Sequence, residues 1–115
     1  MRSPFSFSSS QRIKERPEFQ RTFREGKRLY SALYILYYRA NGLKQARIGV
    51  ITSKRNVRKA VWRNRIKRVI RETFRLRQSK LKPVDIVVVA QKKASNANKE
   101  ELKQCLEQLL IKLTS

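Results

Sequence analysis

The chain has 115 residues, of which 29 are Lys or Arg and 8 are Asp or Glu, so its formal net charge is +21. This length predicts one domain with a single core, and an apolar fraction of 40% is enough to fill that core. Charge of this sign and size favours binding to nucleic acid. Because the chain has no His and its carboxylates are scattered, we expect neither a catalytic site nor a metal site formed by the protein.

A membrane is the competing use of so much positive charge. No apolar run approaches the roughly 18 residues of a spanning helix, and the first residues do not resemble a signal peptide. We therefore expect a soluble, cytoplasmic protein. The single Cys105 cannot form an internal disulfide, and its position on an apolar helical stripe predicts a buried thiol.

Residues 1–12 are rich in Ser and lack a periodic pattern, which predicts a flexible tail, and residues 13–115 are predicted to form a single RNA-binding α/β domain. That domain is predicted to begin with a helix from Ile13 to Arg24. Pro17 suits its first turn, and Gly26 suits the position just past its end.

Phe19 and Phe23 lie four residues apart and therefore share one face of this first helix. Such a pair usually belongs to a core. The alternative is an aromatic platform for unstacked bases, which the basic residues around the pair favour. Both interpretations hold if the rings line the wall of a cleft.

A strand is predicted from Arg28 to Arg39, where aromatic and β-branched residues are frequent. Alternation separates its side chains into two faces, one with Tyr30, Tyr34, Leu36 and Tyr38 and the other with Leu33, Ile35 and Tyr37. Four tyrosines exceed what a small core needs, so some rings should be exposed for stacking on RNA. Asn41-Gly42 predicts a hairpin turn into a returning strand from Arg47 to Thr52, where Gly49 would permit close backbone approach.

The segment from Lys54 to Lys82 carries 13 Lys or Arg residues among 29, and Glu72 is its only acid. Neither Pro nor Gly interrupts Asn56 to Leu81, which predicts a helix of about 25 residues, or roughly 37 Å, that ends before Pro83. Like charges at this density repel one another, so we expect a polyanion beside the helix.

Helical spacing divides this segment into an apolar and a basic face. The apolar arc is predicted to contact the core and contains Trp62, Ile66, Val69, Ile70 and Thr73, with Phe74 near its edge. The opposite face carries Asn64, Lys67, Arg68, Arg71 and Arg75, with Arg63 and Arg65 at its margins. Asn64 can both donate and accept hydrogen bonds, which suits a ribose hydroxyl or a base edge. A merely solvated face is the competing interpretation, and the single sign of the charges disfavours it.

Residues 84–90, V-D-I-V-V-V-A, predict a central strand buried on both faces. Asn98 and Glu101 predict a capping box that begins a last helix. Leucines at helical spacing should make that helix cover the remaining face of the sheet, namely Leu102, Leu106, Leu109, Leu110 and Leu113. The predicted order is helix, strands, helix, strand, helix.

The run R-I-G-V-I-T-S-K-R-N-V-R-K-A-V-W-R-N-R-I-K-R-V-I-R-E-T-F-R, from Arg47 to Arg75, closely resembles the signature of the protein subunit of bacterial ribonuclease P. The resemblance implies an α+β fold, an α/β sandwich of three helices and a four-stranded sheet in which the basic helix makes a left-handed crossover. It also implies a holoenzyme whose catalytic RNA uses Mg²⁺ to remove the 5′ leader from precursor tRNA. The protein would bind both that RNA and the leader, and no obligatory protein partner is evident.

Two groups of site residues follow from the resemblance. Those implied for the catalytic RNA are Arg58, Lys59, Arg63, Asn64, Arg65, Lys67, Arg68, Arg71 and Arg75. Those implied for the leader cleft are Phe19, Phe23, Tyr34, Tyr37, Lys54 and Arg55. Some relatives have a Gly-containing loop before the basic helix, whereas the corresponding N-V-R-K segment here is one residue longer.

Two other functions fit the composition. A small ribosomal or RNA-chaperone protein could use the same basic helix, although it would lack the paired aromatic cleft. A nuclease made of protein alone is the weaker alternative, because the chain has no His and no cluster of carboxylates.

Overall fold

The computed structural model describes residues 16–114, so the tail predicted at residues 1–12 lies outside the described part of the chain. The elements follow the predicted order: α1 (Arg16–Glu25), β1 (Lys27–Tyr30), β2 (Tyr34–Ala40), β3 (Arg47–Ile51), α2 (Ala60–Arg77), β4 (Val84–Ala90) and α3 (Lys99–Ile111). Short 3-10 turns, η2 (Gln78–Lys80) and η3 (Lys92–Asn96), flank β4. None of the helices in this part combines the length and apolar character that crossing a membrane requires.

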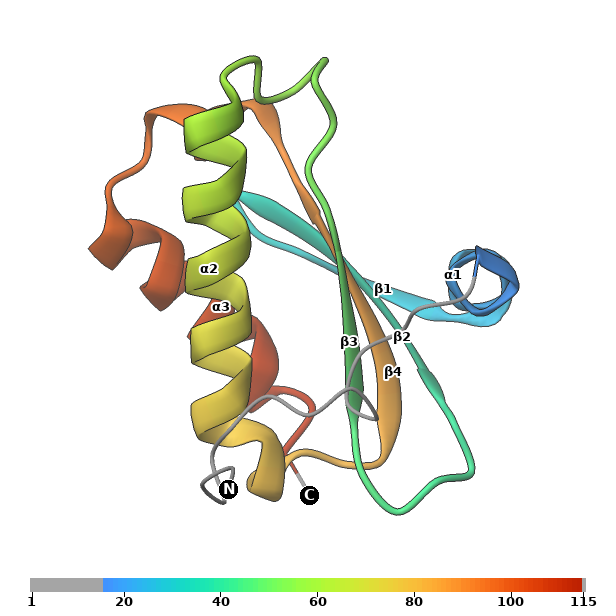
Figure 1. Cartoon of the computed structure of the whole chain (residues 1–115). Coiled ribbons are helices and arrows are strands. Elements are labelled where there is room, and N and C mark those ends of the chain that lie inside the picture. The colour runs from blue at the N-terminus through green and yellow to red at the C-terminus, as the bar shows by residue number, and fades with distance from the viewer. Residues whose placement is uncertain (1–15, 115) are drawn as a thin grey trace, which may run out of the picture.

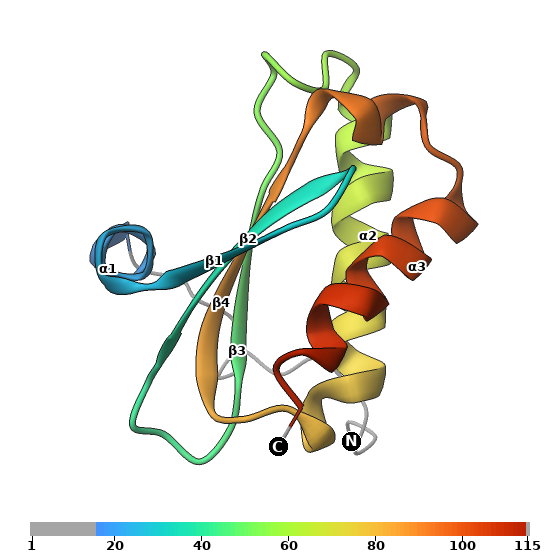
Figure 2. The ribbon, with the colours of Figure 1, turned by 180° about the vertical axis from the view of Figure 1, so that it is seen from behind.

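The three helices lie on two sides of the sheet (Figures 1 and 2). The longer helices α2 and α3 cover one face, and α1 lies across the other. Most of the buried apolar side chains belong to the core between the sheet and the α2–α3 layer, including Leu36, Ile48, Ile70, Phe74 and Leu106. The fold is thus the predicted α+β sandwich, with one face of the sheet only partly covered.

The sheet has the order β1-β2-β4-β3, in which only β3 and β4 are parallel. Strand β4 is buried along almost its whole length and lies between β2 and β3, as its apolar sequence predicts. A strand that is apolar on both faces is most stable in a central position, because there both of its faces are shielded from water and both of its edges are hydrogen-bonded. Strands β3 and β4 with α2 form a β-α-β unit, and the left-handed sense of its crossover stays a prediction.

Two predictions about the strands are wrong. The segment from Arg28 to Arg39 is two antiparallel strands, β1 and β2, because the chain turns back at Ser31–Leu33. The turn at Asn41-Gly42 exists, with Gly42 at φ +68°, but it does not form a hairpin. Strand β4 inserts between β2 and β3, so the turn joins strands that are not neighbours.

A buried ion pair fixes the end of the sheet near this turn. Asp85 of β4 is 1% exposed, and its two oxygens accept hydrogen bonds from Arg47 Nε at 2.8 Å and Nη2 at 2.7 Å. Asn41 Nδ2 donates to the same carboxylate at 3.1 Å. Because a buried carboxylate must be compensated, this network holds β2, β3 and β4 in one register.

The basic helix begins later than predicted, at Ala60 instead of Asn56. The cause is Val57, which is fully buried and whose N–H donates to the carbonyl of Ser53 at 2.9 Å. Burying this side chain turns residues 52–59 into a loop and leaves Lys59 with an extended backbone. An α2 of 18 residues extends about 27 Å, shorter than the predicted length.

Both other helices match their capping signals, but the predicted position of α3 is wrong. It does not cover the remaining face of the sheet; it packs beside α2 on the same face. Asn98 and Glu101 form the predicted capping box at the start of α3. Gly26 ends α1, and a Cβ there would lie 2.6 Å from the carbonyl oxygen of Tyr38. Glycine therefore allows α1 to pack directly against β2.

Candidate nucleic-acid interface

The basic side of α2 has the geometry that helical spacing predicts. Ile66, Val69, Ile70, Thr73 and Phe74 are buried on the core side. On the other side Asn64, Arg65 and Arg68 are exposed, and Lys67, Arg71 and Arg75 are partly exposed. We call these six residues the α2 basic face. Arranged over several turns on one side of a helix, they can contact consecutive phosphates.

Arg63 differs from these residues because its guanidinium is used within the protein. Its Nη1 donates to the carbonyl oxygens of Val57 at 2.9 Å and Arg58 at 2.7 Å. Arg63 therefore fixes the loop that precedes α2. Its predicted contact with the catalytic RNA is correspondingly limited to the remaining N–H groups, and its principal role here is to position the loop.

Ion pairs also involve the C-terminal half of α2. Arg75 pairs with Glu72 one turn earlier, with Nε 3.3 Å from Oε2. The hydrogen bond from Arg75 lowers the pKa of Glu72, and the same bond raises the pKa of Arg75. Arg77 Nη2 lies 2.6 Å from Glu107 of α3 and joins the two helices. The exposed positive charge is consequently concentrated in the first half of α2.

Four predicted cations lie in the β3–α2 loop, outside the helix. Lys54, Arg55, Arg58 and Lys59 are all exposed, and the Lys59 ammonium lies 4.8 Å from the centroid of the Trp62 ring. Arg58 and Lys59 thus do not extend the α2 basic face as a longer helix would. They form a separate basic loop at the N-terminal end of α2.

Three aromatic rings meet where helix α1 packs across the partly covered face of the sheet, at the position predicted for the leader cleft, and we call this group of rings the aromatic cleft. Phe19 lies over Gly49 of β3, since a Cβ on Gly49 would be 2.5 Å from two carbons of the Phe19 ring. Phe23 contacts Tyr37 of β2 edge to face, with centroids 4.6 Å apart and planes at 75°. All three rings are half-buried. They are therefore both packing residues and accessible rings, and Gly49 has the role that the sequence suggested.

Tyr34 does not belong to this cleft, and its predicted role in leader binding is wrong. It lies on the other face of the sheet, is fully buried, and its hydroxyl donates to the carbonyl of Leu102 at 3.0 Å. Burial raises the pKa of Tyr34 above its ordinary value, and the nearby Cys105 raises it further. Period-two alternation puts Tyr34 and Tyr37 on opposite faces, so only Tyr37 can line the cleft. Cys105 is only partly buried, less than its helical stripe predicts.

An exposed aromatic residue was not among the predicted site residues. Tyr30 is 59% exposed at the end of β1, and the guanidinium carbon of Arg28 is 5.8 Å from its ring centroid. It pairs with Ile35 in the sheet register, which puts it on the same face as Tyr37. Only the turn between β1 and β2 reveals this, because the sequence alone indicated a single strand.

The fold and these surfaces define a small RNA-binding α/β protein, with a basic helix on one side of its sheet and the rings of Phe19, Phe23 and Tyr37 beneath α1 on the other. Comparisons with known proteins identify the class more closely. The family model for Ribonuclease P matches residues 7–114, and the chain belongs to that family, whose members assist the RNA catalytic subunit in tRNA 5′ processing. The chain is therefore a component of a ribonuclease holoenzyme that contains the ribonuclease P RNA.

The individual relatives agree with this assignment over nearly the whole chain. A ribonuclease P protein component of Coxiella burnetii is 48% identical over 107 residues, which cover 93% of this chain and 88% of the relative. One from Escherichia coli O157:H7 is 39% identical and covers 90% of this chain and 87% of its own length. The solved ribonuclease P protein of Staphylococcus aureus superposes with a TM-score of 0.85 at 31% identity, covering 91% of this chain and 98% of that one. Family membership favours ribonuclease P over the ribosomal or RNA-chaperone alternative.

Proposed function

We propose that the α2 basic face binds the catalytic RNA of ribonuclease P while the cleft between α1 and the sheet holds the unpaired 5′ leader of precursor tRNA. The observation that carries this proposal is the separation of the two surfaces by the sheet, with α2 on one face and α1 on the other. Two RNA molecules can then contact the protein at the same time without competing for one site.

The chemistry of each surface suits its proposed partner. The exposed side chains of Asn64, Arg65 and Arg68 offer charge and hydrogen bonds to a folded RNA, which a protein recognises mainly by its shape and phosphates. Phe19, Phe23 and Tyr37 instead offer flat rings, on which any base can stack. Stacking tolerates variation in sequence, so it can serve the leaders of many precursors. Lys54 and Arg55 in the β3–α2 loop supply the charge for the leader backbone.

The protein itself is proposed to break no bonds. Its sequence lacks His, and four carboxylates in the described part of the chain pair with arginines: Glu25 with Arg39, Glu72 with Arg75, Asp85 with Arg47 and Glu107 with Arg77. The arginines occupy the oxygens of these carboxylates, which leaves them poorly placed to accept a proton from an attacking water. Hydrolysis with Mg²⁺ is therefore assigned to the RNA subunit.

The cytoplasmic location of the protein also stays a prediction.

The decisive experiment is reconstitution with the catalytic RNA at low Mg²⁺. The chain should restore cleavage of precursor tRNA that the RNA alone performs poorly, because it neutralises the repulsion between the two RNAs. Cleavage by the purified chain without RNA would refute the proposed division of labour.

A second measurement separates the cleft from the helix. Phe19→Ala and Phe23→Ala should each weaken binding of precursor tRNA by about 1 to 3 kcal/mol while leaving mature tRNA unaffected. Equal weakening of both substrates would show that the rings only support the fold.

A further inference from the structure

Three exposed lysines lie at the end of the molecule where β4 begins. Lys80 ends η2, Lys82 lies in the link between η2 and β4, and Lys112 directly follows α3. The two segments are joined, because the backbone N–H of Lys82 donates to the carbonyl of Leu113 at 3.0 Å. We call Lys80, Lys82 and Lys112 the basic end. Since paired chains run about 5 Å apart, Lys82 and Lys112 are close in space although they are far apart in the sequence.

Buried leucines hold the backbone of the basic end in place. Leu81 is 7% exposed and Leu113 is 3% exposed, and both belong to the core. Leu81 also forms a β-bridge with Thr114. Lys82 lies between Leu81 and Pro83, and a residue before proline is restricted to extended conformations. The backbone that carries these charges therefore needs no ordering when a ligand binds.

No neighbouring acid in the sequence balances the charge of the basic end. The two segments that form it, residues 78–84 and 108–114, contain neither Asp nor Glu. The acids that border these segments are Asp85 and Glu107, and each already pairs with an arginine. Positive charge of this kind attracts a polyanion.

Stabilisation of helix ends explains only part of this cluster. A cation beyond the C-terminus of a helix interacts favourably with the helix dipole, which accounts for Lys80 after α2 and for Lys112 after α3. Lys82 belongs to no helix, and its side chain forms no ion pair with any residue that the structure describes. An exposed ammonium group in such a place suits a phosphate.

The basic end lies beyond the C-terminal end of α2, away from the exposed cations of its first half. The helix rises about 18 Å from Arg65 to Arg77, and η2 follows directly. Between the two positive surfaces, Glu72 pairs with Arg75 and Glu107 with Arg77. Two positive surfaces are therefore separated by a belt of ion pairs.

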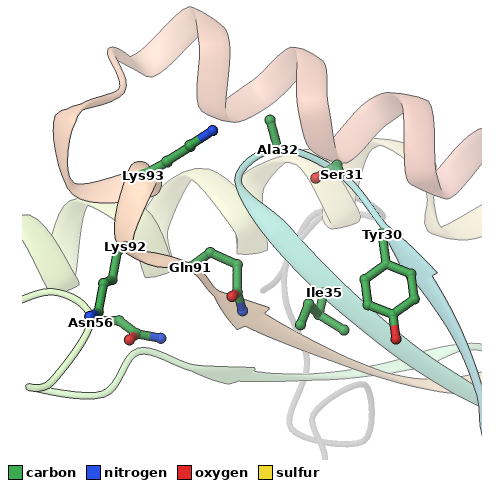
Figure 3. Close-up of a pocket in the computed structure, with 8 residues that line it drawn as sticks. All are labelled: Tyr30, Ser31, Ala32, Ile35, Asn56, Gln91, Lys92 and Lys93. Carbon is green, nitrogen blue, oxygen red and sulfur yellow. The ribbon is translucent and has the colours of Figure 1, made fainter.

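The opposite end of β4 also carries lysines, but it is a different place on the molecule. A pocket of about 380 Å³ at that end is lined by Lys92 and Lys93, among others (Figure 3). The 7 residues of β4 extend about 23 Å, so a single phosphate cannot contact both ends of the strand. A ligand of the basic end therefore binds independently of the pocket in Figure 3.

We propose that the basic end binds phosphates of the catalytic RNA, at a position separate from the contacts of the α2 basic face. This inference rests on the proposed function of that face and extends it. Lysines suit the task because a phosphate contact positions a protein on RNA without reading its sequence. Two contacts roughly 20 Å apart hold the protein in one orientation on the RNA, which keeps the aromatic cleft directed toward the leader.

The first test measures the affinity of the full chain for the catalytic RNA across salt concentrations, with no tRNA present. Lys82→Ala/Lys112→Ala should lower the magnitude of the salt slope by about 1.4 to 1.8, because two phosphates are no longer neutralised. Between about 50 and about 200 mM salt, the wild type should therefore lose about 7- to 12-fold more affinity than the variant. Lys82→Arg/Lys112→Arg, which keeps both charges, should behave like the wild type.

Lys44→Ala/Lys99→Ala is the matched control for lost charge. It removes two exposed lysines that lie apart from each other, in the β2–β3 turn and at the start of α3, and its salt slope should stay near that of the wild type. Hydroxyl-radical footprinting of the catalytic RNA provides an independent readout. Lys82→Ala/Lys112→Ala should lose protection of one RNA segment and keep the segment whose protection Arg65→Ala loses.

The outcomes separate this inference from the function beneath it. An unchanged slope or an unchanged footprint in Lys82→Ala/Lys112→Ala overturns the basic end, and so does an equal loss in the control, since net charge alone would then matter. A loss that appears only with precursor tRNA also overturns it, because the phosphates would belong to the substrate. If Arg65→Ala leaves both readouts unchanged while the lysine variant lowers both, the basic end is correct and the proposed contact of the α2 basic face is wrong. Thermal unfolding of each variant identifies losses caused by misfolding.

Discussion

Gly49→Ala should weaken leader binding, because the added methyl group would collide with the ring of Phe19. A Cβ at this position would lie 2.5 Å from Cε1 and Cζ of Phe19, whereas carbon atoms normally approach to about 3.5 Å or more. The ring must therefore move by about 1 Å. Because those atoms are the far end of the side chain, we expect the ring to be displaced and the sheet to remain in place.

This displacement has two measurable consequences. Overpacking typically costs about 1 to 3 kcal/mol of stability, and the mobility of the ring places Gly49→Ala near the lower end of that range. Loss of one base stack costs about 1 to 3 kcal/mol of precursor affinity, or roughly 5- to 150-fold in Kd. Affinities of the holoenzyme for precursor and mature tRNA, measured in parallel, should show the loss for precursor only. Thermal unfolding of the protein alone, followed by fluorescence or calorimetry, gives the change in the free energy of unfolding.

Phe19→Ala supplies the matched control, because it removes the atoms with which the new methyl group collides. In that background Gly49→Ala should change neither stability nor precursor affinity, so the two substitutions should be strongly non-additive. Additive effects would refute the contact as the cause. Equal weakening of precursor and mature tRNA would refute the role of the Phe19 ring in leader binding.

Three other predictions concern the α2 basic face, its loop and the core. Arg65→Ala should weaken assembly with the catalytic RNA and lower the magnitude of the salt slope by about 0.7 to 0.9, which a titration across salt concentrations measures; an unchanged slope would exclude a phosphate contact. Arg63→Ala should instead lower stability by about 1 to 3 kcal/mol, because two loop carbonyls, those of Val57 and Arg58, lose their charged donor. Tyr34→Phe should cost about 1 kcal/mol in denaturant unfolding at neutral pH. Burial raises the pKa of Tyr34 in the folded state, so its contribution is complete below its ordinary pKa of 10.0 and declines as pH rises above it, and the difference between wild type and Tyr34→Phe should shrink over that alkaline range.

Local patterns correctly predicted that the helices and the buried strand exist and which residues of α2 are buried. The buried arc from Ile66 to Phe74 follows from the helical period alone, because an amphipathic helix packs its apolar side against the core and leaves its charged side in water. The capping box at Asn98 and the central place of β4 follow equally from short-range signals. Such features depend on residues a few positions apart, which the sequence displays directly.

The pairing of strands that are far apart in the chain could not be predicted from such local patterns. The expected hairpin at Asn41-Gly42 does not form because β4, more than forty residues later, lies between β2 and β3 and pairs with both of them. In this position Asp85 of β4 also forms its ion pair with Arg47 of β3. The helix expected from Asn56 begins at Ala60 because the core takes up the side chain of Val57. Neither competition leaves a trace in local periodicity.

The amino-acid sequence by itself determined that this protein is a basic RNA-binding domain of the ribonuclease P family, because net charge, the spacing of α2 and the signature from Arg47 to Arg75 are properties of the linear chain. Only the tertiary structure decided which rings can meet RNA. Tyr34 and Tyr37 are three residues apart in one strand, yet the helix layer buries the first and α1 leaves the second half-exposed. The position of each layer relative to the sheet, which depends on packing across the whole chain, makes one tyrosine structural and the other available for binding.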